Sequence, residues 1–170
     1  NYTDESNEYQ RKNTLMNLGN QLRCDFNNNA ILALGVAQEI HDKRPKENDQ
    51  AKPWYNHAFI INSLKHPDEV KRLRDIYNDG YYLIGVYSDK EARLKKLLGT
   101  SENKQADQEV VNQLIERDES EELDYGQNTR KTFELSDFFI HLNDSKSLLE
   151  NSLQRILELI FGNPYLTPTF

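Results

Sequence analysis

Two patterns of apolar residues alternate along the chain. Six segments place apolar residues three or four positions apart, as an amphipathic helix does, and they are 15–26, 31–41, 67–77, 89–98, 110–115 and 146–161. Three short continuous apolar runs, at 58–61, 81–87 and 137–142, are typical of strands that are buried on both faces. Strands separated by helices predict an α/β fold, a parallel sheet with helices on both faces.

Local signals place the ends of several helices. Pro67 suits the first position of a helix, because its missing N–H would be unpaired there. Ser145 can cap the last helix, since its hydroxyl can accept a hydrogen bond from the first turn. The polar stretch 1–12 is predicted to be disordered or a linker, and the folded domain is predicted to cover 13–162.

The predicted strands all lead into polar residues, and ligands of parallel sheets bind at the carboxyl ends of the strands. These residues are Asn62-Ser63 with Lys65 and His66 after the first run, Ser88-Asp89 after the second, and Asn143-Asp144 after the third. We therefore expect the basic turn, Lys65-His66, to contact a phosphate or a nucleotide. A solvated loop is the alternative interpretation.

Three arginines are further candidates for contact with a nucleotide. Arg93 lies on the helix predicted after the second strand, where a merely solubilising cation is the alternative. Arg117 and Arg130 flank the acidic run 118–124, and guanidinium groups are planar donors that suit phosphate oxygens. The segment 114–133 is either a lid over a nucleotide or a helical hairpin whose arginines pair with its own carboxylates.

Composition and charge narrow the function. The chain has 170 residues and a net charge of −7, which disfavours general binding to nucleic acids or anionic membranes. No apolar stretch approaches about 20 residues, so no membrane-spanning helix is predicted. Cys24 is the single cysteine, which favours a reducing compartment, and we expect a cytoplasmic protein.

Common catalytic motifs are missing from the chain. It contains neither G-x-x-x-x-G-K-[ST] nor G-x-G-x-x-G, and no H-x-E paired with P-C-x-x-C. Its four histidines are scattered, and with one cysteine no zinc cage is expected. We therefore predict no catalytic residue and no metal site within these residues.

Four stretches carry a resemblance to a known family. They are SLKHPDEVKRLRDIY, YYLIGVYS, LIERDESEELDYGQNTRKTFELSDFFI and LIFGNPYLTPTF. In the longer form HAFIINSLKHPDEVKRLRDIY and YYLIGVYSDKEARLKKL, the first two resemble the later half of a P-loop nucleoside-monophosphate-kinase-like domain, and SDFFIHLNDSKSLLENSLQRIL resembles its last strand and helix. Together the four resemble the N-terminal half of bacterial two-domain deoxycytidylate deaminases, including the antiphage dCTP/dCMP deaminases, and the resemblance covers about residues 13–170.

The resemblance implies a nucleotide-binding, regulatory P-loop-kinase-like domain, with 163–170 as the linker to a C-terminal deaminase domain. The zinc ligands and catalytic glutamate of that domain would follow Phe170, and the Walker-type strand and loop would precede Asn1. The whole protein would act in nucleotide metabolism or antiphage defence, hydrolysing the 4-amino group of dCMP or dCTP with a zinc-bound water. Its expected partners are dCTP, dCMP or an ATP- or GTP-like nucleotide with Mg²⁺, and further copies of itself in a homo-oligomer.

The resemblance also predicts that a strand is supplied from outside these residues. In a kinase-like sheet, the strand that feeds the P-loop lies between those expected at 58–62 and 81–87. Without it, two strands lose their shared partner, and each unpaired buried backbone group costs about 1–3 kcal/mol. Because total stability is only about 5–15 kcal/mol, we expect upstream residues to provide this strand.

Two other functions fit the same residues. The first is a free-standing nucleotide-kinase-like protein with its P-loop upstream, although Asn62 stands where many P-loop kinases have an aspartate. The second is a non-catalytic interaction domain, for which nucleotides would leave the melting temperature unchanged.

Overall fold

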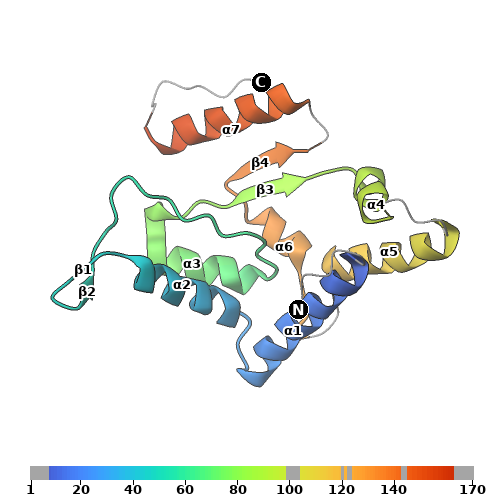
Figure 1. Ribbon diagram of the computed structural model, residues 1–170, viewed down its shortest axis with the longest axis horizontal. Coiled ribbons are helices and arrows are strands. Elements are labelled where there is room, and N and C mark those ends of the chain that lie inside the picture. The colour runs from blue at the N-terminus through green and yellow to red at the C-terminus, as the bar shows by residue number, and fades with distance from the viewer. Residues whose placement is uncertain (1–7, 99–103, 120, 122–123, 143–144, 163–170) are drawn as a thin grey trace.

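The computed structural model describes residues 8–98, 104–119, 121, 124–142 and 145–162. Its α-helices are α1 (Glu8–Asp25), α2 (Ile31–Lys43), α3 (Pro67–Tyr77), α4 (Lys90–Leu98), α5 (Lys104–Glu119), α6 (Thr129–Glu134) and α7 (Lys146–Ile160). Its strands are β1 (Lys46–Glu47), β2 (Gln50–Ala51), β3 (Ile84–Tyr87) and β4 (Phe138–His141), and η2 (Asn78–Gly80) is a 3₁₀ turn. The described chain is therefore a mostly helical α/β structure with two two-stranded sheets (Figure 1).

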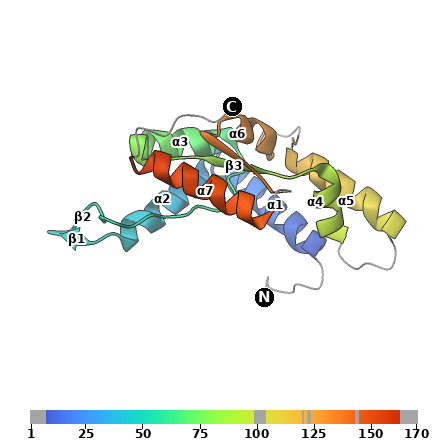
Figure 2. The same ribbon diagram turned by 90° about the horizontal axis from the view of Figure 1, so that it is seen from above.

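β3 and β4 form a parallel pair, in which Ile84 lies opposite Phe138. The predicted strands at 81–87 and 137–142 are thus confirmed, each in a shorter form. Figure 2 shows α6 and α7 on opposite sides of this pair. A side chain at Gly85 would lie 2.6 Å from the Ser136 hydroxyl and 2.8 Å from the Phe133 ring, so this position needs glycine for close packing.

α3 occupies the centre of the helical part. Val70 and Leu73 are fully buried, and α3 packs against α2. Arg74, in the last turn of α3, attaches this end of the helix to the sheet, because its guanidinium donates to Asp137 at 2.8 Å. Asp137 in turn accepts from the N–H of Leu83 at 2.7 Å, just before β3. α3 is therefore held at a defined position relative to the parallel strands.

The prediction of a strand at 58–61 is wrong for the described chain. These residues belong to neither sheet, and Ile60 is 95% exposed. The apolar run correctly indicates a strand-forming composition, but a strand needs a hydrogen-bonded neighbour, and the described residues place none beside it. The parallel sheet consequently has two described strands where three were expected, and a P-loop arrangement is not seen among the described residues.

Other boundaries also differ from those expected. α1 begins at Glu8, so residues 8–12 are helical rather than a disordered or linker segment. The β1–β2 hairpin follows α2, and its turn residues Asn48 and Asp49 have φ of 50° and 61°, as hairpin turns require. α6 begins inside the segment 114–133, for which a helical hairpin was one of the two interpretations. The linker expected at 163–170 lies outside the described residues.

The described helices include none that is long and apolar enough to cross a membrane.

The close packing at Gly85 can be tested by Gly85→Ala. We expect the free energy of unfolding to fall by about 1–3 kcal/mol, since overpacking shifts the Phe133 ring or the strand. Gly80→Ala is the matched control, because a Cβ at this position would have no described atom within 4 Å. Urea unfolding measures both variants, and equal midpoints would contradict this account.

Candidate functional site

The basic turn, Lys65-His66, forms the entry to α3. His66 is the N-cap residue, and its Nδ1 accepts a hydrogen bond from the N–H of Asp68 at 3.1 Å. Glu69 reaches back and accepts from the N–H of Lys65 at 2.7 Å and of His66 at 3.1 Å. This is a capping box with histidine at the N-cap, and it fixes the backbone of both basic residues.

A buried ion pair holds the glutamate of this capping box. Arg23 on α1 donates to Glu69 at 2.9 Å, and the two side chains are 1% and 2% exposed. The Arg23 guanidinium also donates to Asn20 at 3.2 Å. Since Glu69 binds the backbone of the basic turn with its other oxygen, α1 positions that turn through one buried side chain.

The Lys65 amine is paired within the chain. Its Nζ lies 2.8 Å from an Asp118 carboxylate oxygen on α5, and the lysine side chain is 31% exposed. Thr129 on α6 donates to the same oxygen at 3.4 Å, and the N–H of Asn128 donates to the Lys65 carbonyl at 2.8 Å. The basic turn therefore connects α3 with α5 and α6.

Arg117, on the last turn of α5, is one of the predicted nucleotide-binding residues. Its Nε donates to Glu121 at 2.9 Å, and its two Nη groups donate to Asn13 at 2.6 Å and Asn17 at 2.7 Å on α1. These contacts attach α5 to α1.

The other two predicted arginines lie apart from each other. Arg93 on α4 pairs with Glu119 of α5 at 2.8 Å. Arg130 on α6 is 78% exposed and lies 4.0 Å from Glu134, one helical turn away. The end of α5 thus brings Lys65, Arg93 and Arg117 towards neighbouring carboxylates, whereas Arg130 is not part of this cluster.

The carboxylates at the end of α5 determine what the site can bind. Asp118, Glu119 and Glu121 each face one predicted cation, so a phosphate must compete with a carboxylate for Lys65, Arg93 or Arg117. The pairing of Arg117 with Glu121 corresponds to the second interpretation of residues 114–133, a helical hairpin whose arginines pair with its own carboxylates. Nucleotide binding by these residues, Arg130 included, stays a prediction.

A second polar group lies at the carboxyl ends of the parallel strands. His141 Nε2 at the end of β4 lies 3.6 Å from Asp89, two residues after β3. The His141 ring stacks on Tyr87 with ring centroids 4.6 Å apart. Sequence reasoning singled out Asp89 as a polar strand end but missed His141, because that histidine lies inside an apolar run.

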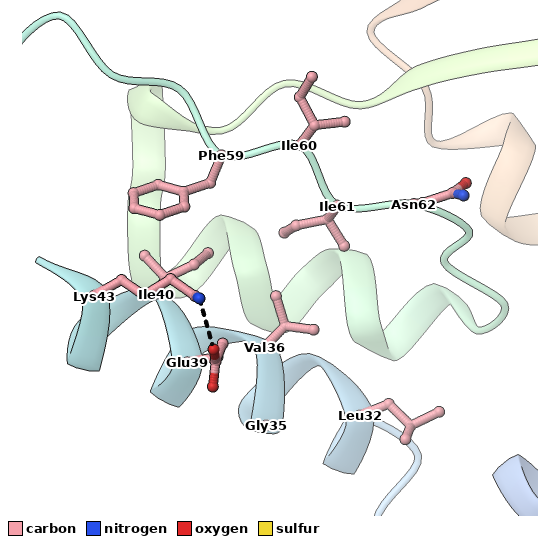
Figure 3. Close-up of a pocket in the computed structure, with 10 residues that line it drawn as sticks. All are labelled: Leu32, Gly35, Val36, Glu39, Ile40, Lys43, Phe59, Ile60, Ile61 and Asn62. Atoms are coloured by element: carbon pink, nitrogen blue, oxygen red, sulfur yellow. Dashed lines mark ion pairs between the residues drawn. The ribbon is translucent and has the colours of Figure 1, made fainter.

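Figure 3 shows an apolar groove of about 500 Å³ between α2 and residues 59–62. Phe59 and Ile61 point towards α2, while Ile60 points away from it. Gly35 lines the groove, and a Cβ at this position would have no described atom within 4 Å. Asn62 and the ion pair of Glu39 with Lys43 at 3.0 Å also line the groove, and the remaining lining residues are apolar.

Protonation of His66 is linked to its role as a cap. Burial lowers the pKa of His66 from its ordinary value of 6.5, and Asp68 opposes this shift. An accepting Nδ1 requires the neutral ring, so the ring proton is then on Nε2. The lowered pKa and the cap therefore favour the same neutral form.

Comparison of the chain with protein-family models, curated proteins and solved structures gives no match. The class of the molecule is therefore defined by its own features. It is a mostly helical α/β protein with a parallel strand pair and a basic turn at the entry to its central helix.

The buried ion pair is expected to dominate the stability of the basic turn. Glu69→Gln leaves Arg23 without a counter-charge, and we expect a loss of about 3–5 kcal/mol in the free energy of unfolding. The double variant Arg23→Met with Glu69→Gln should recover part of that loss, because no buried charge remains. Chemical denaturation of the wild type, the two single variants Glu69→Gln and Arg23→Met and the double variant measures this, and additive losses would contradict it.

The lowered pKa of His66 predicts a pH dependence of stability. Between its ordinary value of 6.5 and the lowered folded-state value, the unfolded chain binds more protons than the folded one. The stability that neutral His66 contributes is therefore fully present above pH 6.5. It is lost as the pH falls from 6.5 through the lowered pKa of the folded state. His66→Asn keeps a capping acceptor without titrating, so it should lose less stability between about pH 7.5 and 5. Parallel curves for the two proteins would refute this.

Proposed function

We propose that this chain is the nucleotide-binding, regulatory portion of a zinc-dependent deoxycytidylate deaminase that acts in the cytoplasm, with a P-loop-kinase-like fold completed from outside these residues. The position of the basic turn supports this proposal best. α3 runs opposite to β3, so that its N-terminus lies on the side to which both parallel strands point (Figure 1). Ligands of parallel α/β sheets bind at this edge.

The contacts of the turn specify how it would hold a phosphate. The N–H groups of Lys65, His66 and Asp68 already donate to side chains, and Pro67 has none, so the helix entry offers few backbone donors. The phosphate would therefore be bound by the Lys65 amine and by Nε2–H of His66. Lys65 would exchange Asp118 for a phosphate oxygen, which makes binding a competition between two anions.

Zinc belongs to a different part of the proposed protein. The described residues contain no group of three or more His, Cys, Asp or Glu side chains that could hold a metal ion. In this proposal it is the resemblance that assigns zinc to a deaminase domain outside these residues, where it would supply an activated water. The role of this chain would be to sense a nucleotide and to support assembly of a homo-oligomer.

A non-catalytic interaction domain is the second candidate. Two observations favour it, namely the pairing of Lys65, Arg93 and Arg117 with the chain's own carboxylates and the apolar groove along α2. An unchanged melting temperature of the intact protein with dCTP, dCMP, ATP or GTP, each with and without Mg²⁺, would favour this candidate over the first.

Variants of the intact protein test the phosphate contact. Lys65→Ala should weaken nucleotide binding about tenfold or more, since a hydrogen bond to a charged group contributes about 1.5–3 kcal/mol. Asp118→Asn should strengthen binding, because it removes the competing anion. Lys71→Ala is the matched control, because Lys71 is an exposed cation on α3, the helix that follows the basic turn, and it pairs with Asp68 at 3.1 Å. Calorimetry measures all three affinities, and equal effects of both lysine variants would contradict the proposal.

The deaminase assignment has its own test. Purified intact protein should contain zinc and convert dCTP or dCMP to the deoxyuridine nucleotide. Protein that binds nucleotide but lacks both properties would instead support a free-standing kinase-like protein.

A further inference from the structure

Asp118 holds the Lys65 amine with an oxygen that a second donor also reaches. Its Oδ1 accepts from Lys65 Nζ at 2.8 Å and from the Thr129 hydroxyl at 3.4 Å. The lysine and aspartate side chains are 31% and 26% exposed. Solvent therefore screens this ion pair only in part, and a hydroxyl beside the carboxylate changes how strongly the two charges attract each other.

Thr129 is the first residue of α6, and the start of this helix is fixed without the Lys65 amine. The N–H of Asn128 donates to the Lys65 carbonyl at 2.8 Å, so the backbone of the basic turn holds the helix. The Asn128 side chain caps the first turn, and the buried Thr132 donates its hydroxyl to the Asn128 carbonyl at 2.8 Å. The Thr129 hydroxyl therefore keeps its place beside Asp118 when the amine moves away.

The hydroxyl stabilises the free carboxylate more than the paired one. While Lys65 is bound, the ammonium compensates most of the charge on Oδ1 of Asp118, and the hydroxyl adds little. When Lys65 leaves, the hydroxyl donates to an uncompensated negative charge, and hydrogen bonds to charged groups are stronger than those between neutral groups. A contact that is stronger in one of two states shifts the equilibrium towards that state. Thr129 therefore favours release of the lysine.

We propose that Thr129 is a positioning residue of the phosphate site, whose hydroxyl compensates Asp118 so that Lys65 can exchange this carboxylate for an anionic ligand. Thr129 acts through Asp118 and needs no contact with the ligand. The compensation is a property of these three side chains in the unliganded chain. Only the identity of the ligand, a nucleotide phosphate, rests on the proposed function.

Acetylation of lysines in the intact protein without nucleotide tests the compensation. Acetic anhydride reacts with the neutral amine, and a nearby opposite charge keeps an amine protonated. Thr129→Val removes the hydroxyl, so Asp118 should hold Lys65 more tightly and the acetylation rate of Lys65 should fall about three- to tenfold. Lys71, which pairs with Asp68 at 3.1 Å, is the internal reference, and peptide mass spectrometry measures both rates.

Two further variants separate this effect from a structural role of Thr129 in α6. Thr129→Ser keeps the hydroxyl and should restore the wild-type rate for Lys65. Asp118→Asn removes the charge, so Thr129→Val added to it should leave the rate of that variant unchanged. A rate that Thr129→Val does not change in the wild-type background, or lowers equally in the Asp118→Asn background, would overturn the proposal.

Calorimetry of the same variants connects the exchange of Lys65 to a ligand. The probe is whichever of dCTP, dCMP, ATP and GTP the wild type binds most tightly. Thr129→Val should weaken its binding about three- to tenfold, because Asp118 then competes more strongly for the amine. Thr129→Ser should bind as the wild type does, and in the Asp118→Asn background Thr129→Val should have no effect.

The two measurements distinguish failure of this inference from failure of the proposed function. If the wild type binds a nucleotide but Thr129→Val and Thr129→Ser have equal affinity, the role of Thr129 is refuted while nucleotide binding stands. If the wild type binds none of the four nucleotides, the proposed function has failed, and the acetylation rates of Lys65 alone decide the role of Thr129.

Discussion

The ion pair between Arg23 and Glu69 is the constraint on which the rest of the structure depends. Both charges are almost completely buried, so neither can lose the other without a large cost in free energy. The pair fixes α1 to α3, and the second oxygen of Glu69 fixes the backbone of the basic turn. Arg74 attaches the other end of α3 to Asp137, just before β4, so one charged contact joins α3 to α1 and another joins it to the strand pair.

Local signals in the sequence were sufficient to place most of the helices and the strand pair, but not all of their ends. Pro67 and the periodicity that follows it set α3, and Ser145 accepts from the first turn of α7 as expected. The prediction of a strand at 58–61 was wrong because a strand needs a hydrogen-bonded neighbour, and amino-acid composition does not reveal whether one is present. The capping box was not predicted, although Glu69 follows His66 by three residues, because histidine is not among the usual N-cap residues. The buried partner of Glu69, Arg23, is 46 positions away from it. No local pattern predicts that contact.

The candidate site was predicted residue by residue rather than as an arrangement. Lys65 and Arg117 could either bind a nucleotide or pair within the chain, and contacts across 53 and 104 positions decide which partners they have. In the described structure, acidic side chains near the end of α5 occupy them. The acidic run thus determines how available the cations are, whereas the sequence alone left open whether its carboxylates pair with the chain's own arginines.

The contact between Lys65 and Asp118 has a thermodynamic consequence for the whole helical part. A ligand that draws the Lys65 amine away from Asp118 releases α5 from the turn that α1 positions through Glu69. Occupancy of the turn and the relative placement of α1, α3 and α5 are then reciprocally coupled quantities. Any partner that shifts these helices against one another must change ligand affinity by the same factor by which the ligand changes the affinity for that partner.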